Sequence, residues 1–216
     1  MTTERERIAC DLHDELGSSL NYISMSVSDL GRSRGDDAEE LKSRLEKVST
    51  FAVRTARSLA DMVWAVKPQN DSLRSLVEYL TQLARELFED TGIRCRFQIQ
   101  EDLPALPLPP EMRHHLFLTV KEALNNTLKH ARATEIVLGA ATAGRQVELF
   151  IHDNGAGFDA AAAAGSERNG LKNMRRRIET LGGRLMVETK PGDGTTIRLT
   201  VSYPTGYKPE SPAGAK

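Results

Sequence analysis

The stretch Glu122-Ala-Leu-Asn-Asn126-Thr-Leu-Lys-His130 is the part of the sequence from which the fold of this chain can be predicted. Its pattern is typical of a helix that carries an acid, an amide and two bases. These four residues are Glu122, Asn126, Lys129 and His130. They stand at positions i, i+4, i+7 and i+8, so a helix presents all of them on one face.

A second stretch, Asp153-Asn-Gly-Ala-Gly157, follows the apolar strand Val147–Ile151 and places an acid and two glycines where the backbone must turn. A nucleotide-binding site would need the residues of both stretches. Together they offer oxygen ligands for Mg²⁺, cations for phosphate, a carboxylate that accepts from an adenine amino group, and glycines that let a nucleotide approach. The sequence therefore predicts an ATP site. It is not a P-loop, because GxxxxGK[ST] does not occur in the chain.

These two stretches resemble the N box and the G1 box of the GHKL ATPases, which include histidine kinases, gyrase-type ATPases and Hsp90-type chaperones. The stretch Glu4-Arg-Glu-Arg-Ile-Ala-Cys-Asp-Leu-His13-Asp14-Glu-Leu-Gly-Ser-Ser-Leu20 closely resembles the phosphoacceptor box of the sensor histidine kinases that include nitrate and membrane-fluidity sensors. The resemblance covers residues 4–204, with the boxes in the family's order. It implies an α+β fold, in which a two-helix hairpin dimerises into a four-helix bundle and a GHKL (Bergerat) α/β sandwich follows.

The apolar pattern of the N-terminal part predicts two long helices. Apolar residues recur at three- and four-residue steps from Ile8 to Leu30 and from Leu41 to Val66, around the turn Gly31–Asp37. Pro68 ends the second helix because proline lacks the N–H. A hairpin with one apolar stripe needs a partner, and two hairpins in a dimer form a four-helix bundle. Packing of the hairpin onto the chain's own C-terminal domain is the alternative.

The rest of the chain predicts a mixed sheet covered on one face by helices. We expect helices at Ser72–Asp90, 111–131 and Leu171–Leu181, and strands at Ile93–Ile99, Glu135–Ala140, Gln146–His152, Arg184–Thr189 and Thr195–Val201. This divides the chain into a dimerisation and histidine phosphotransfer domain (1–68), an ATP-binding catalytic domain (69–204) and a disordered tail (205–216).

Composition narrows the class of protein independently. Hydrophobic content of 39%, charged content of 27% and a net charge of −1 are ordinary for a soluble globular protein and argue against a nucleic-acid or membrane-surface binder. The basic run Lys172–Arg177 spreads around a helix and forms no DNA-binding stripe. Cys10 and Cys95 have no CxxC partner, so neither a disulfide framework nor a zinc site is expected. Without a long apolar run or a signal peptide, we expect a cytoplasmic protein, or the cytoplasmic part of a membrane-anchored sensor.

The resemblance assigns the phosphoacceptor to His13, which lies at the edge of the apolar stripe formed by Leu12 and Leu16 and is therefore accessible. Phosphoryl transfer needs a neutral imidazole whose lone pair faces the γ-phosphate. Asp14 is the family's candidate for the carboxylate that fixes the tautomer and raises the nucleophilicity, and Glu15 is the less favoured substitute.

The resemblance also assigns roles in the ATP domain. Asn126 corresponds to the Mg²⁺ ligand, and Glu122 to the acid that orients a water on the metal or the reacting groups. Lys129 and His130 are expected to meet the phosphates as cation and hydrogen-bond donor. Asp153 is expected to accept from the adenine N6 amino group.

Further site residues come from the glycine boxes. Gly155, Gly157 and Gly170 are expected to let the chain bend around the nucleotide. Gly194-Thr195-Thr196 resembles the family's closing glycine–threonine box, and Thr196 is expected to reach the adenine. Of the basic residues in Lys172–Arg177, we expect Arg175 to face the triphosphate. The loop 159–169 resembles the lid over the nucleotide, with small side chains that predict mobility without ATP.

The implied function is that of an ATP-dependent protein-histidine kinase, a homodimer that uses ATP and Mg²⁺. It would autophosphorylate His13 and pass the phosphoryl group to an aspartate on a response regulator receiver domain. Two alternatives stay open: a degenerate kinase that holds a response regulator without turnover, and a GHKL ATPase or serine kinase. The junction Lys67–Asp71 is the expected hinge. Ser18 stands where the subfamily usually carries glutamine, which predicts weak phosphatase activity toward the regulator.

Overall fold

The structure is a computed structural model that describes residues 23–28, 38–66, 72–159 and 169–203. The chain divides into two compact units, Met1–Lys67 and Pro68–Lys216. The predicted phosphoacceptor pair His13 and Asp14, the departure at Ser18 and the proposed hinge 67–71 all lie outside the described residues.

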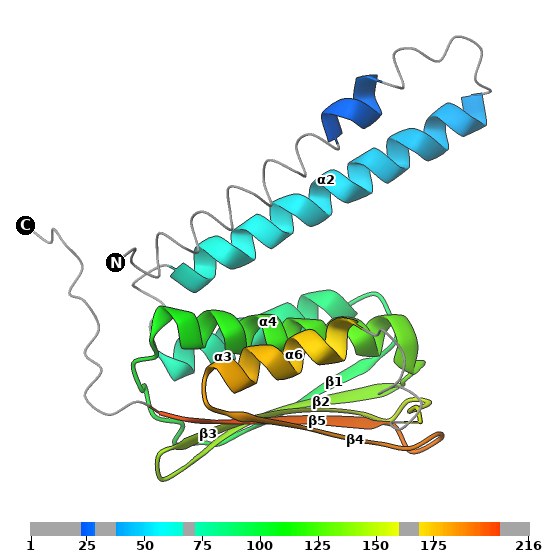
Figure 1. Cartoon of the computed structure of the whole chain (residues 1–216). Coiled ribbons are helices and arrows are strands. Elements are labelled where there is room, and N and C mark those ends of the chain that lie inside the picture. The colour runs from blue at the N-terminus through cyan, green and yellow to red at the C-terminus, as the bar shows by residue number, and fades with distance from the viewer. Residues whose placement is uncertain (1–22, 29–37, 67–71, 160–168, 204–216) are drawn as a thin grey trace, which may run out of the picture. The chain divides into compact units, whose positions relative to one another are not determined.

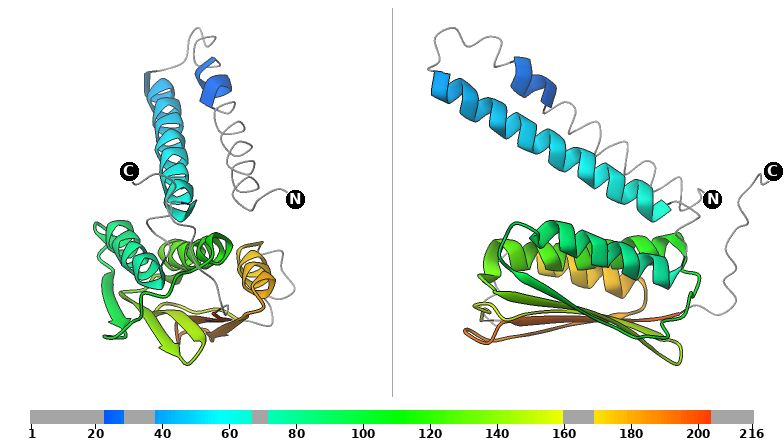
Figure 2. Two further views of the ribbon diagram at one scale, coloured as in Figure 1. Left: turned by 90° about the vertical axis from the view of Figure 1, so that its left-hand side faces the viewer. Right: turned by 180° about the vertical axis from the view of Figure 1, so that it is seen from behind.

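The first unit contains the long helix α2, Ala38–Val66, with the helical segment 23–28 beside it (Figures 1 and 2). Helix α2 ends two residues before Pro68, as expected from the proline's missing N–H. Large apolar side chains are exposed along it, including Leu45 at 52% and Val53 at 59%. In the described part of this unit, the apolar stripe is therefore only partly covered.

The second unit is a five-stranded sheet in the order β1-β2-β3-β5-β4, with helices over one face (Figures 1 and 2). The strands are β1 (Arg94–Ile99), β2 (Glu135–Ala143), β3 (Gln146–Asp153), β4 (Arg184–Thr189) and β5 (Thr195–Ser202). The covering helices are α3 (Leu73–Phe88), α4 (Pro110–Asn126) and α6 (Asn169–Thr180). Strand β1 is parallel to β2, and the other neighbouring strands are antiparallel. The predicted mixed α/β sandwich is confirmed.

Helix α3 begins where its sequence predicts. Ser72 caps the helix, its hydroxyl accepting from the Ser75 N–H at 3.1 Å. The connector between β1 and α4 lies along this first turn, because the Leu73 N–H donates to the Leu106 carbonyl at 2.7 Å and the Arg74 guanidinium donates to the Leu103 carbonyl at 2.5 Å. The proline-rich segment is thus held against α3.

The predicted helix 111–131 differs from the observed one at its C-terminal end. Helix α4 starts with Pro110 in its first turn, where a missing N–H costs nothing, and ends at Asn126. The chain continues as a π-helix, η2, over Thr127–Ala131. It then stops at Arg132, a non-glycine residue in the left-handed region with φ of 52°. Such wider turns are rare and are often found at functional sites.

Strands β3 and β5 form the part of the sheet that lies under the cavity described below. Asp153 is paired with Thr195, and Ile151 with Ile197. Because successive side chains on a strand point to opposite faces, these four residues share the face that is covered by helices. None of the helices in the described residues is both long enough and apolar enough to span a bilayer.

Candidate functional site

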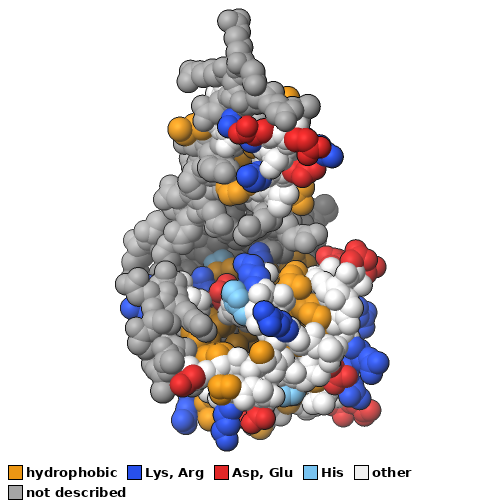
Figure 3. All heavy atoms as spheres, turned by 90° about the vertical axis from the view of Figure 1, so that its right-hand side faces the viewer, with side chains coloured by type: hydrophobic (Ala, Val, Ile, Leu, Met, Phe, Trp, Pro, Cys, Tyr) orange, Lys and Arg blue, Asp and Glu red, His pale blue; other side chains and the backbone are white. Residues whose placement is uncertain are grey.

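A cavity of about 630 Å³ lies between α4, η2, the start of α6 and strands β3 and β5. This volume is within the range of about 300–1,000 Å³ that is usual for small-molecule sites. Its lining residues are Glu122, Ala123, Asn126, Thr127, Lys129, His130, Ala131, Ile151, Asp153, Gly157, Phe158, Gly170, Leu171, Thr195 and Ile197. In Figure 3, cationic and histidine side chains lie along one border of a hollow in which apolar side chains are visible.

Helix α4 and η2 supply the polar wall of the cavity. The structure brings together all four residues of the opening motif there, with Glu122 and Asn126 half-buried and Lys129 and His130 exposed. Oxygen donors therefore lie within the cavity, and groups that can meet phosphate lie at its rim.

Asp153, the last residue of β3, provides a buried carboxylate on the sheet side of the cavity. Its side chain is 5% exposed. Oδ1 accepts from the Gly155 N–H at 3.0 Å, which fixes the turn after β3. The Thr127 hydroxyl lies 3.3 Å from Oδ2 and also 3.3 Å from the Ala123 carbonyl oxygen. A buried carboxylate with few donors favours a ligand that brings a donor of its own.

The sequence motifs did not identify Thr127 as a site residue. It lies one position after Asn126, and its hydroxyl is the group from η2 that contacts Asp153. The signal in the sequence is weak, because a helix-internal threonine usually bonds the carbonyl four residues earlier.

The three glycines chosen from the sequence lie around the site, each for a different reason. Gly157 has φ of +57°, and a side chain there would place Cβ 2.0 Å from the Lys190 carbonyl oxygen. A Cβ on Gly170 would lie 2.5 Å from a carboxylate oxygen of Glu122. Gly155 does not line the cavity, but its N–H holds Asp153.

Thr196 is not among the cavity-lining residues, and its contact with adenine stays a prediction. The neighbouring residue Thr195 lines the cavity. The Thr196 hydroxyl lies 3.0 Å from Nδ1 of His152, its register partner on β3. Strand alternation is the reason, because Thr195 shares the helix-covered face with Ile197 and Thr196 faces the opposite side.

Arg175 is exposed and is not among the cavity-lining residues, and its role toward the triphosphate stays a prediction. Arg177 on α6 does not line the cavity either, but its charge interacts with that of the cavity-lining Glu122. It is half-buried, and burial lowers the pKa of its guanidinium, while the Glu122 carboxylate opposes that shift. Helical side chains lean toward the N-terminus of their helix, and Gly170 at the N-terminal end of α6 lies beside Glu122.

The donor set fits a nucleotide bound with a magnesium ion. Glu122 and Asn126 offer hard oxygen ligands. Among the described residues there is no group of three or more His, Cys, Asp or Glu side chains that would hold a metal on its own. Magnesium is usually held by one or two protein oxygens together with phosphates and water, which matches this sparse set.

Comparison with known proteins identifies both parts of the chain. The family described as "Histidine kinase" matches residues 4–71, and that described as "Histidine kinase-, DNA gyrase B-, and HSP90-like ATPase" matches residues 112–205. The nitrate/nitrite sensor protein NarQ of Escherichia coli is 32% identical over 91% of this chain and 34% of its own length. The sensor histidine kinase LiaS of Bacillus subtilis is 28% identical over 93% of this chain and 54% of its own length. The chain thus spans between a third and about half of these relatives.

Two solved structures share the fold. The histidine kinase domain of the blue-light activated kinase EL346 from Erythrobacter litoralis has a TM-score of 0.57 at 17% identity, covering 86% of this chain and 94% of that one. The histidine kinase AdeS of Acinetobacter baumannii has a TM-score of 0.58 at 12% identity, covering 87% and 96%. With the histidine kinase and ATPase domains matched in this order, the chain belongs to the sensor histidine kinase family, as its motifs predicted.

Proposed function

We propose that this chain is the catalytic core of an ATP-dependent protein-histidine kinase. It autophosphorylates His13 and then donates the phosphoryl group to an aspartate of a response regulator receiver domain. It acts as a homodimer and uses ATP with Mg²⁺. The observation that carries the proposal is the single cavity in which Asn126, Lys129 and the buried Asp153 meet.

Each wall of the cavity suits one part of ATP. The buried Asp153 carboxylate suits the N6 amino group of adenine, because an ionised acceptor makes strong hydrogen bonds in a dry site. The apolar side chains of Ile151 and Ile197 suit the faces of the base. Lys129 and His130 at the rim suit the phosphates.

Bound Mg²⁺ would neutralise charge on the phosphates as the γ-phosphoryl group leaves. The chain's own residues position the reactants. Asn126 would hold the ion through its amide oxygen, and Glu122 would orient the reacting groups. His13 would attack the γ-phosphorus as a neutral imidazole, forming the N–P bond as the bond to ADP breaks, while Asp14 accepts a hydrogen bond from the other ring nitrogen.

The proposal is tested by incubating the protein with γ-labelled ATP and magnesium. We expect label that is lost in acid and retained in base, as for phosphohistidine. Asn126→Ala is expected to abolish it. Asn125→Ala is the matched control, because Asn125 is half-buried on the same helix turn, does not line the cavity and bonds the Lys121 carbonyl at 3.0 Å. Label that is acid-stable, or equal in the Asn126→Ala variant and the parent, would refute the proposal.

A further inference from the structure

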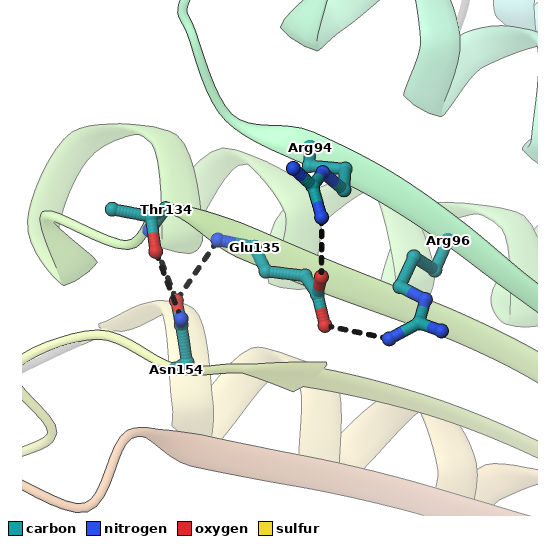
Figure 4. Close-up of polar contacts among 5 residues, drawn as sticks. All are labelled: Arg94, Arg96, Thr134, Glu135 and Asn154. Carbon is teal, nitrogen blue, oxygen red and sulfur yellow. Dashed lines mark hydrogen bonds and ion pairs between the residues drawn. The ribbon is translucent and has the colours of Figure 1, made fainter.

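The side chain of Asn154, next to the proposed adenine reader, joins the end of β3 to the beginning of β2 (Figure 4). Its amide oxygen accepts from the backbone N–H groups of Thr134 and Glu135, both at 2.9 Å. Its amide nitrogen donates to the Thr134 hydroxyl at 2.9 Å. One side chain therefore makes three hydrogen bonds to two adjacent residues of another segment.

These bonds continue the sheet beyond its last residue pair. The β2–β3 ladder ends with Ile136 opposite Asp153. The Asn154 N–H donates to the Glu135 carbonyl at 3.2 Å, and its amide oxygen satisfies two N–H groups at the start of β2. The backbone on the C-terminal side of Asp153 is thus fixed against β2.

The same turn also contacts the end of η2. The Ala156 N–H donates to the Ala131 carbonyl at 2.7 Å, and a Cβ on Gly155 would lie 2.3 Å from that oxygen. The turn after Asp153 therefore has little room for movement on this side. Asn154 holds its other side.

The ion pairs drawn beside Asn154 contribute less to this fixation. Glu135 pairs with Arg96 at 3.3 Å and with Arg94 at 3.9 Å, but the two arginine side chains are 63% and 79% exposed. Exposed pairs of this kind stabilise a fold only slightly. The amide of Asn154 bonds backbone groups directly and is therefore the stronger constraint.

We infer that Asn154 is a positioning residue that sets the nucleobase selectivity of the site by holding the Asp153 carboxylate in register with the base. The inference rests on the proposed function, in which Asp153 accepts from the adenine N6 amino group. Inosine triphosphate is the natural probe, because it carries a carbonyl oxygen where ATP has that amino group. A carboxylate held in place lies against the carbonyl oxygen of inosine triphosphate and weakens its binding, because both groups are acceptors. A carboxylate that can move away from this oxygen weakens the binding less.

The test compares the Kd of ATP with that of inosine triphosphate, by calorimetry on the whole chain. For the parent we expect ATP to be favoured by about fivefold to a hundredfold, the range for a buried polar group that gains or loses its partner. Asn154→Gln, which shifts the amide by one methylene, is expected to bring this ratio down at least about threefold. Asn154→Asp keeps the acceptor oxygen and is expected to retain most of the ratio.

Gln100 offers a matched control at the other end of β2. Its amide oxygen accepts from the Thr142 N–H at 2.7 Å and lies 3.3 Å from the Thr142 hydroxyl, away from the cavity. Gln100→Ala is expected to lower Tm about as much as Asn154→Gln without changing the ratio. If Asn154→Gln leaves the ratio at the parent value, the positioning role is wrong. Equal losses of selectivity in Gln100→Ala and Asn154→Gln would also overturn it.

A further arm separates this inference from the proposed function. Asp153→Ala is expected to bring the ratio close to one. If Asp153→Ala lowers the Kd ratio and Asn154→Gln does not, Asp153 contacts the base as proposed and only the positioning role of Asn154 is wrong. If Asp153→Ala leaves the ratio unchanged, the adenine assignment itself fails, and the inference falls with it.

Discussion

The Thr127 side chain limits where the Asp153 carboxylate can lie. Its hydroxyl is buried and 3.3 Å from Oδ2. Thr127→Val keeps the shape and removes the hydroxyl, so we predict a loss of about 1 kcal/mol in ATP binding, roughly fivefold in Kd by calorimetry. Thr119→Val on the preceding helix α4 is the control, because no hydrogen-bond partner for the buried Thr119 hydroxyl is found among the described residues. It is expected to leave ATP affinity unchanged and to raise Tm. An unchanged Kd in Thr127→Val would contradict the account.

The charge of Arg177 interacts with the Glu122 carboxylate, which opposes the lowering of the Arg177 pKa by burial. We predict that Arg177→Gln lowers the autophosphorylation rate roughly tenfold, because a mispositioned Glu122 would raise the activation free energy by about 1.4 kcal/mol. The Kd of ATP is expected to change less than about twofold. Arg175→Gln, on the exposed side of the same helix, is the control and should resemble the parent. Equal effects of the two substitutions would show that α6 contributes only general charge.

At the scale of elements, the first turn of α6 matters because it lies against α4 at the cavity. A methyl group on Gly170 would lie 2.5 Å from a Glu122 oxygen, the mobile end of a flexible side chain. We predict that Gly170→Ala folds normally and loses turnover, measured as the single-turnover labelling rate. Gly157→Ala meets the Lys190 backbone carbonyl at φ of +57°, so it should instead lower Tm by several degrees. The reverse pattern of the two variants would contradict this geometry.

The elements themselves were largely predictable from the sequence, and the limits have physical causes. Strand β4 has the predicted bounds Arg184–Thr189, since alternation and flanking glycines define such a strand well. The strand order was not predictable, because pairing between distant segments leaves no local pattern. The π-helix after Asn126 was missed, since it changes the backbone turn without changing the helical character of the sequence.

The sequence also predicted part of the candidate site. The N-box residues and Asp153 line one cavity in the structure. The spacing of their motifs in the sequence was enough to predict this. The structure places Thr195, and not Thr196, among the cavity-lining residues, and the alternation of Ile197 and Leu199 already indicated that Thr195 shares the covered face. Arg177 shares a helix face with Gly170 and Met174, at steps of four and three residues, whereas Arg175 is exposed.

At the scale of the whole molecule, the exposed apolar residues of α2 support the proposed homodimer. Leu41 and Leu45, one turn apart, are 39% and 52% exposed, and their burial against a second copy would stabilise a bundle. We predict that Leu45→Glu shifts the protein toward monomer in sedimentation experiments and reduces autophosphorylation. Ser43→Glu, on the opposite face of α2, should remain dimeric. A Leu45→Glu variant that stays dimeric would exclude this face as the interface.

The claim on which the whole account depends is that His13 receives the γ-phosphoryl group of ATP bound in the cavity. It is tested most directly by measuring γ-phosphate labelling and ATP affinity in parallel for the parent and for His13→Gln. We predict that His13→Gln binds ATP with the parent's Kd and gains no acid-labile label. A His13→Gln variant that is labelled as fully as the parent would contradict it.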